Sequence, residues 1–78
     1  MSELQKLLLV VTTEYILDHG YSPARSVLAN ALRIPEGSVA SGLRALIQKG
    51  YFFKRSAAWN SLEINGDMVP PMPWRRGK

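Results

Sequence analysis

The sequence predicts a mainly α-helical domain of the α+β class, in which three helices precede a β-hairpin. Apolar residues recur at helical spacing through residues 3–49. Aromatic and aliphatic residues then form two short runs with strand character within residues 51–64. The chain has 78 residues, enough for one domain. We expect that domain to occupy residues 1–66 and residues 67–78 to form a flexible, proline-rich basic tail.

Residues 3–19 are expected to form the first helix. Ser2 is a preferred N-cap, and Gly20 supplies the left-handed residue that ends a helix. The helix has two apolar faces, which hold Leu4, Leu7, Leu8, Val11 and Tyr15 on one side and Leu9, Val10, Ile16 and Leu17 on the other. Two interpretations remain open, because either the domain wraps around both faces or the second face meets another copy of the chain.

The second helix is expected to begin at Ser22 and Pro23, which suit the N-cap and the first helical position. It runs to about Leu32. Its expected inner face consists of Val27, Leu28, Ala31 and Leu32. In the turn that follows, Arg33 occupies a position where glycine is usual. Either this arginine is left-handed, at a cost on the order of 1 kcal/mol, or the turn differs slightly.

The third helix is expected from about Pro35 to Lys49, with Gly50 ending it. Its apolar stripe consists of Val39, Leu43, Leu46 and Ile47. Two runs of strand character follow, at 51–55 and 62–64, joined by a short loop and closed by a turn at 65–67. At the loop tip, Trp59 either contacts a partner or folds back over Tyr51 or Phe53.

The composition excludes several classes of function. The chain has no cysteine and one histidine, so disulfides, thiolate metal sites and histidine metal clusters are excluded and no cofactor is expected. His19, at a helix end, lacks the partners of a catalytic triad, and we expect no enzyme. No apolar run approaches the ~20 residues that a membrane helix needs. The absence of cysteine fits a reducing cytoplasm, and we expect a cytoplasmic protein.

The charge is unevenly distributed. The net charge is +4, with an acidic segment at 1–19, a basic segment at 20–55 and a basic end at 75–78. This asymmetry is typical of a surface that faces phosphate, although ordinary surface lysine and arginine would look similar.

Several segments resemble known DNA-binding proteins. Residues 19–23 (His-Gly-Tyr-Ser-Pro) resemble the turn between the first two helices of the LexA-type repressor DNA-binding domain. Residues 33–43 are similar to the turn and recognition helix of sigma-factor region four, although Ala40 and Gly42 replace residues that are usually basic there. The generic bacterial winged helix-turn-helix pattern is matched across residues 9–64 by Leu28, Ala29, Leu32, Ile34, Val39, Leu43, Leu46, Lys49, Gly50 and Tyr51.

The resemblance implies a three-helix winged helix-turn-helix domain with a C-terminal hairpin wing, whose third helix enters the major groove. The residues expected on its outer face are Ser38, Ser41, Ala45 and Gln48, flanked by Gly37 and Arg44. Arg44 is the strongest guanine reader among them, and the two serines suit either bases or phosphates. The residues expected to contact the phosphate backbone are Ser22, Arg25, Lys54, Arg55, Arg75 and Arg76.

These observations favour a small DNA-binding transcriptional regulator whose partner is double-stranded DNA. A palindromic site would require a homodimer, formed through the first helix or the tail. The alternative is a protein-interaction module on the same fold, such as a phage-type or plasmid-type inhibitor or adaptor that does not bind DNA. The few base-reading residues on the third helix and the tail segment around Trp74 motivate this alternative.

Overall fold

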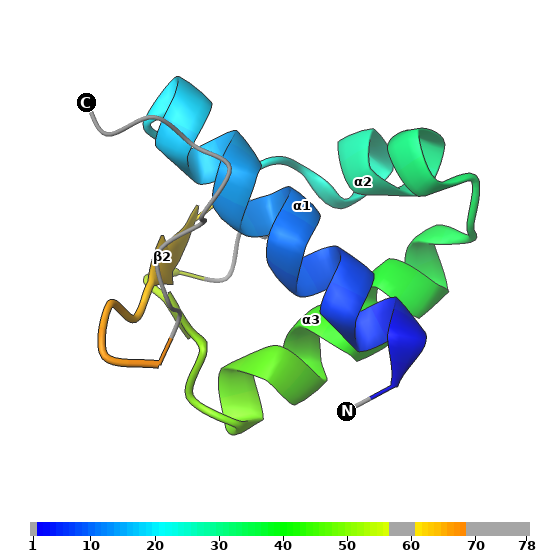
Figure 1. The fold of residues 1–78 in the computed structure, drawn as a ribbon. Helices are drawn as coiled ribbons and strands as arrows, with labels where there is room; N and C mark the ends of the chain where they lie inside the picture. Colours follow the sequence, from blue (N-terminus) through cyan, green and yellow to red (C-terminus); the bar gives the residue numbers. More distant parts are fainter. Residues whose placement is uncertain (1, 57–60, 69–78) are drawn as a thin grey trace.

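The computed structural model describes residues 2–56 and 61–68. Its elements, in chain order, are α1 (Glu3–His19), α2 (Arg25–Leu32), α3 (Glu36–Gln48), β1 (Phe52–Lys54) and β2 (Leu62–Ile64). The described part is therefore mainly α with a small antiparallel hairpin, as the sequence predicted. In Figure 1, α1 lies across α3, α2 precedes α3, and the hairpin follows its C-terminal end.

Both ends of α1 are confirmed. The Ser2 hydroxyl oxygen accepts a hydrogen bond from the Gln5 backbone N–H at 3.1 Å, so it satisfies one amide that the helix leaves unpaired. At the other end Gly20 is left-handed, with φ 82°, and its N–H donates to the Ile16 carbonyl. A residue with a side chain would be strained there.

The domain wraps around most of α1, but not all of it. Leu8 is fully buried, while Leu9 and Ile16 from the second face are partly buried against the core. Leu7 and Leu17 remain 51% and 47% exposed. Each of the two apolar faces therefore keeps a large apolar residue at the surface.

α1 packs closely against α3 at Leu8 and Gly42. Gly42 is buried, and a Cβ atom added there would overlap Leu8 Cδ1. The glycine therefore provides the space that the leucine side chain occupies. Further along, Lys49 Nζ donates a hydrogen bond to Gln5 Oε1 at 2.9 Å, which ties the end of α3 to the first turn of α1.

The start of α2 differs from the prediction. The helix begins at Arg25, and its N-cap is Ala24, which has no capping side chain. Ser22 does not cap the helix because its hydroxyl oxygen accepts a hydrogen bond from the buried Leu62 N–H at 2.9 Å. Pro23 is fully buried beside it. A tertiary hydrogen bond therefore replaces the expected local one.

The inner face of α2 is also shifted. Leu28 is 1% exposed, as expected, and Leu32 packs against the core. Val27 is 42% exposed and Ala31 is exposed, so these two expectations are wrong. Ala29, which is 8% exposed, takes the inner position because α3 approaches α2 there.

The turn between α2 and α3 uses a left-handed arginine. Arg33 has φ 57° and ψ 47°, so the first of the two alternatives for this turn is correct. Its conformation lets the Ile34 N–H donate to the Ala29 carbonyl at 3.0 Å. Ile34 then packs against the core.

The hairpin covers the end of the helical core. Phe52 pairs with Ile64, Phe53 with Glu63 and Lys54 with Leu62. Phe52 is completely buried and Leu62 nearly so, while Phe53 points outward and is 52% exposed. Asn65 closes the hairpin, because its side-chain amide donates to the Gly50 carbonyl at 2.7 Å and its N–H donates to Tyr51 O. Within the described residues, no helix has the length and apolar character needed to cross a membrane.

We predict that Gly42→Ala lowers the free energy of unfolding. Its methyl group would overlap Leu8 Cδ1, and overpacking of this kind costs about 1–3 kcal/mol, more than the roughly 0.5–1 kcal/mol that alanine adds inside a helix. Gly37→Ala is the matched control, since nothing lies within 4 Å of its added Cβ. Urea unfolding of both variants tests this, and equal effects would contradict the close approach.

We also predict that Arg33→Gly stabilises the protein relative to Arg33→Ala. Both variants remove the charge, but only glycine relieves the left-handed backbone, which costs about 1 kcal/mol for other residues. The difference between their thermal unfolding midpoints measures this backbone cost. Equal midpoints would show that the turn carries no such cost.

Candidate nucleic-acid interface

One side of α3 is turned entirely into the core. Val39, Leu43 and Leu46 are each 0% exposed, and Ile47 is partly buried beside them. This confirms the predicted stripe. Residues spaced by three or four lie on one helix face, so the opposite side of α3 holds a different set of residues.

The outer face of α3 consists of Gly37, Ser41, Arg44 and Gln48, all of them exposed. These residues follow one another at helical spacing, so they form one continuous strip along the helix. The described residues of the hairpin, 52–56 and 61–64, leave this strip exposed. Of the residues expected there, Ser38 and Ala45 are half-buried, and Ser38 lines a pocket that α1 also lines.

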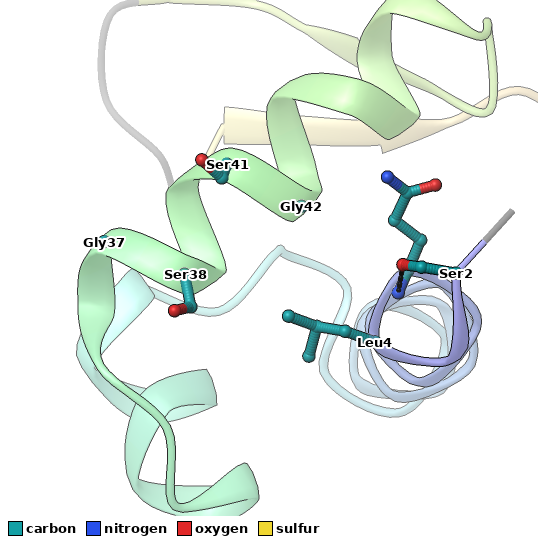
Figure 2. Close-up of a pocket in the computed structure, with 7 residues that line it drawn as sticks. Ser2, Leu4, Gly37, Ser38, Ser41 and Gly42 are labelled. Atoms are coloured by element: carbon teal, nitrogen blue, oxygen red, sulfur yellow. Dashed lines mark hydrogen bonds between the residues drawn. The ribbon is translucent and has the colours of Figure 1, made fainter.

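Ser38 lies in a pocket between the beginnings of two helices. The pocket has a volume of about 290 Å³, and its lining comes from α1 and α3 (Figure 2). The lining residues are Ser2, Leu4, Gln5, Gly37, Ser38, Ser41 and Gly42. Sequence reasoning missed the contribution of α1, because it depends on where α1 crosses α3.

The first turns of α1 and α3 supply hydrogen-bond donors near this pocket. The first amides of a helix have no partner within the helix, and the helix dipole makes that end attractive to anions. The hydroxyls of Ser38 and Ser41 add two further donors. Glu36 disfavours the binding of an anion there, since its carboxylate lies in the first turn of α3.

The expected basic contacts lie on three elements. Arg44 is exposed on α3, Arg25 is half-buried at the start of α2, and Lys54 is half-buried in β1. Arg55, directly after β1, has a side chain that is 70% exposed and forms an ion pair with Glu63 at 2.9 Å. Exposed ion pairs are worth only about 0–1 kcal/mol, so a phosphate group competes readily for this arginine.

Ser22 does not belong to this surface. It is 1% exposed, and its oxygen already accepts the Leu62 N–H. The expectation that it contacts phosphate is therefore corrected to a structural role, in which it joins the segment before α2 to the hairpin. No local pattern distinguishes such a serine from a helix N-cap.

Phe53 is a surface residue that sequence reasoning placed only as a packing partner for Trp59. It is 52% exposed on the outer side of the hairpin, next to the cross-strand residue Glu63. The alternation of side chains along a strand was the available signal, since the neighbouring Phe52 is buried. The expectations for Arg75, Arg76, Trp59 and Trp74 concern positions outside the described residues.

Comparison with protein-family models and curated proteins identifies no relative of this chain. No protein-family model matches the chain, and no curated protein matches it.

We predict that Ser22→Ala lowers the free energy of unfolding by about 1–3 kcal/mol, because it leaves the buried Leu62 N–H without an acceptor. Ser26→Ala is the control, since Ser26 is exposed on α2. Chemical unfolding followed by circular dichroism measures both. A loss no larger for Ser22→Ala than for Ser26→Ala would contradict the structural role.

Proposed function

We propose that this protein is a winged helix-turn-helix protein that binds duplex DNA. In this proposal the outer face of α3 enters the major groove and the hairpin acts as a wing on the phosphate backbone. The observation that carries the proposal is the exposed strip of Ser41, Arg44 and Gln48 on a helix whose other side is fully buried. The major groove, roughly 12 Å wide, admits a helix of this kind.

The arrangement of the three helices supports this reading. α2 and α3 are joined by a short turn and pack against each other, and α1 supports α3 from its inner side. The hairpin follows α3 directly, and Lys54 and Arg55 follow the last residue of α3 by six and seven positions. A helix inserted in the groove would place these two cations close to the flanking phosphates.

Base reading would fall mainly on two residues. Arg44 and Gln48 are separated by one helical turn on the outer face of α3. Arginine pairs bidentately with guanine and glutamine with adenine, while Ser41 accepts either kind of contact. With so few readers, we expect phosphate contacts to dominate affinity and sequence preference to be modest.

Phosphate contacts would come from Arg25, Lys54 and Arg55, together with the donors around Ser38. The basic residues Arg75 and Arg76 are proposed as further contacts. The net charge of +4 also favours binding to DNA, which is negatively charged. Acting in the cytoplasm, the protein would regulate transcription by occupying DNA, and a palindromic target would require a homodimer.

A protein-interaction module on the same fold is the second candidate. The observation that favours it is the exposure of Leu7 and Leu17 on α1, which are 51% and 47% exposed. Single exposed apolar residues are common, but two on one helix also suit a protein contact. Affinity capture before and after nuclease treatment separates the candidates, because nuclease removes partners recovered through DNA and leaves direct protein partners.

Selection from random duplexes, followed by fluorescence anisotropy at increasing salt, tests DNA binding. We predict that the affinity falls steeply with salt and that Arg44→Ala weakens binding to the selected duplex by about 1–3 kcal/mol. Lys6→Ala is the charge-matched control, because Lys6 lies on α1 and pairs there with Glu3. Absence of binding at low salt, or equal losses in both variants, would refute the proposal.

A further inference from the structure

Arg33, in the turn between α2 and α3, has a backbone conformation that favours glycine. Its φ is 57°, and no other non-glycine residue in the described part of the chain has a positive φ. The hydrogen bonds that close this turn are made by backbone atoms, because the N–H groups of Arg33 and Ile34 both donate to the Ala29 carbonyl. Glycine would form the same bonds without the cost of the left-handed conformation. The turn therefore does not require a side chain at position 33.

The Arg33 side chain has no partner among the described residues. The residue is exposed, and no hydrogen bond or ion pair joins its side chain to another described residue, not even to Glu36 three positions later. The other lysines and arginines of residues 2–56 all have an interaction within the protein; they are Lys6, Arg25, Arg44, Lys49, Lys54 and Arg55. The cation without a partner thus stands at the position where a side chain costs stability. Strained residues of this kind point to a role outside the fold.

The position of the turn relative to α3 indicates what that role is. The turn lies at the N-terminal end of α3, and the hairpin follows the C-terminal end (Figure 1). Arg33 precedes Gly37, where the exposed strip of α3 begins, by four positions, so their Cα atoms are at most roughly 14 Å apart. A helix with its side chains is about 10–12 Å across, and the major groove is roughly 12 Å wide. A helix that fills the groove brings the residues flanking its end to the phosphates at the groove edge.

We propose that Arg33 binds a backbone phosphate of duplex DNA beside the N-terminal end of α3. This contact rests on the proposed function and adds a residue to it, at the opposite end of α3 from Lys54 and Arg55. A guanidinium group is permanently charged, and its fork of N–H donors matches the oxygens of a phosphate. The positive charge also offsets the carboxylate of Glu36, which disfavours an anion at this end of the helix.

The proposal separates the effect of residue 33 on stability from its effect on binding. Stability depends on the left-handed backbone, so Arg33→Gly should unfold at a higher temperature than Arg33→Ala, while Arg33→Lys should unfold close to Arg33→Ala. Binding depends on the charge, so the glycine and alanine variants should bind DNA equally weakly and the lysine variant should bind more tightly than either. A defect in folding would instead give the two measurements the same order.

Fluorescence anisotropy on the full chain, with the selected duplex and with a shuffled duplex of the same composition, tests the contact. We expect Arg33→Ala and Arg33→Gly to reduce the slope of log affinity against log salt by about 0.9, the value for one lost phosphate contact, and to lower affinity about eightfold at 0.1 M salt. Both duplexes should show the same loss, because phosphate contacts carry no sequence information. Arg33→Lys should keep the slope. Lys6→Ala is the charge-matched control and should change affinity less than about twofold, since Lys6 pairs with Glu3 on α1.

Several outcomes would overturn the proposal. If the alanine and glycine variants bind like the unaltered chain, Arg33 makes no contact, although the proposed function still stands. A loss in Arg33→Ala but not in Arg33→Gly would assign the effect to the shape of the turn, and an equal loss in Lys6→Ala would assign it to net charge. A loss confined to the selected duplex would show that Arg33 reads a base. If the unaltered chain binds neither duplex at low salt, the proposed function and this contact are both refuted.

Discussion

The fold depends on how closely α1 can approach α3. Leu8 is completely buried, and it occupies the space that a side chain at position 42 would fill. This contact fixes the side of α3 that faces inward, so that Val39, Leu43 and Leu46 enter the core together. The solvent-facing strip with Ser41 and Arg44 is a direct consequence, because the two sides of a helix cannot be oriented independently.

One buried and one partly buried hydrogen bond then hold the hairpin against the helices. Ser22 accepts from the Leu62 backbone, and Asn65 donates to the Gly50 carbonyl where α3 gives way to β1. Phe52, which is fully buried in the hydrophobic core, supplies the apolar contact. A hairpin of two three-residue strands has little stability alone, so its position depends on these tertiary contacts.

Sequence reasoning succeeded where one local rule acted alone. The ends of α1 followed from Ser2 and Gly20, and the inner side of α3 followed from periodicity. It failed where a distant residue competed with the local rule. Ser22 has the chemistry of a helix cap, but its hydroxyl oxygen accepts a hydrogen bond from the backbone N–H of Leu62, which lies forty positions later in the sequence. The role of Gly42 likewise requires knowing which helix crosses there.

The candidate site also contains some features that the sequence could predict and others that it could not. Ser41, Arg44 and Gln48 could be placed on the surface of α3 by elimination, because the other side of the helix is apolar. The pocket that Ser38 and the first turn of α1 line could not be predicted from the sequence, since it arises from the packing of two helices. The pairing of Arg55 with Glu63 needed the strand register, which short strands without a long alternating pattern do not specify.

Chemical-shift mapping with a selected DNA duplex tests most directly whether the α1–α3 packing presents α3 to DNA. We expect the backbone amide signals of Gly37, Ser41, Arg44 and Gln48 to move together on titration, while those of Val10 and Leu17 on α1 stay in place. Shifts concentrated on α1, with the outer face of α3 unaffected, would contradict it.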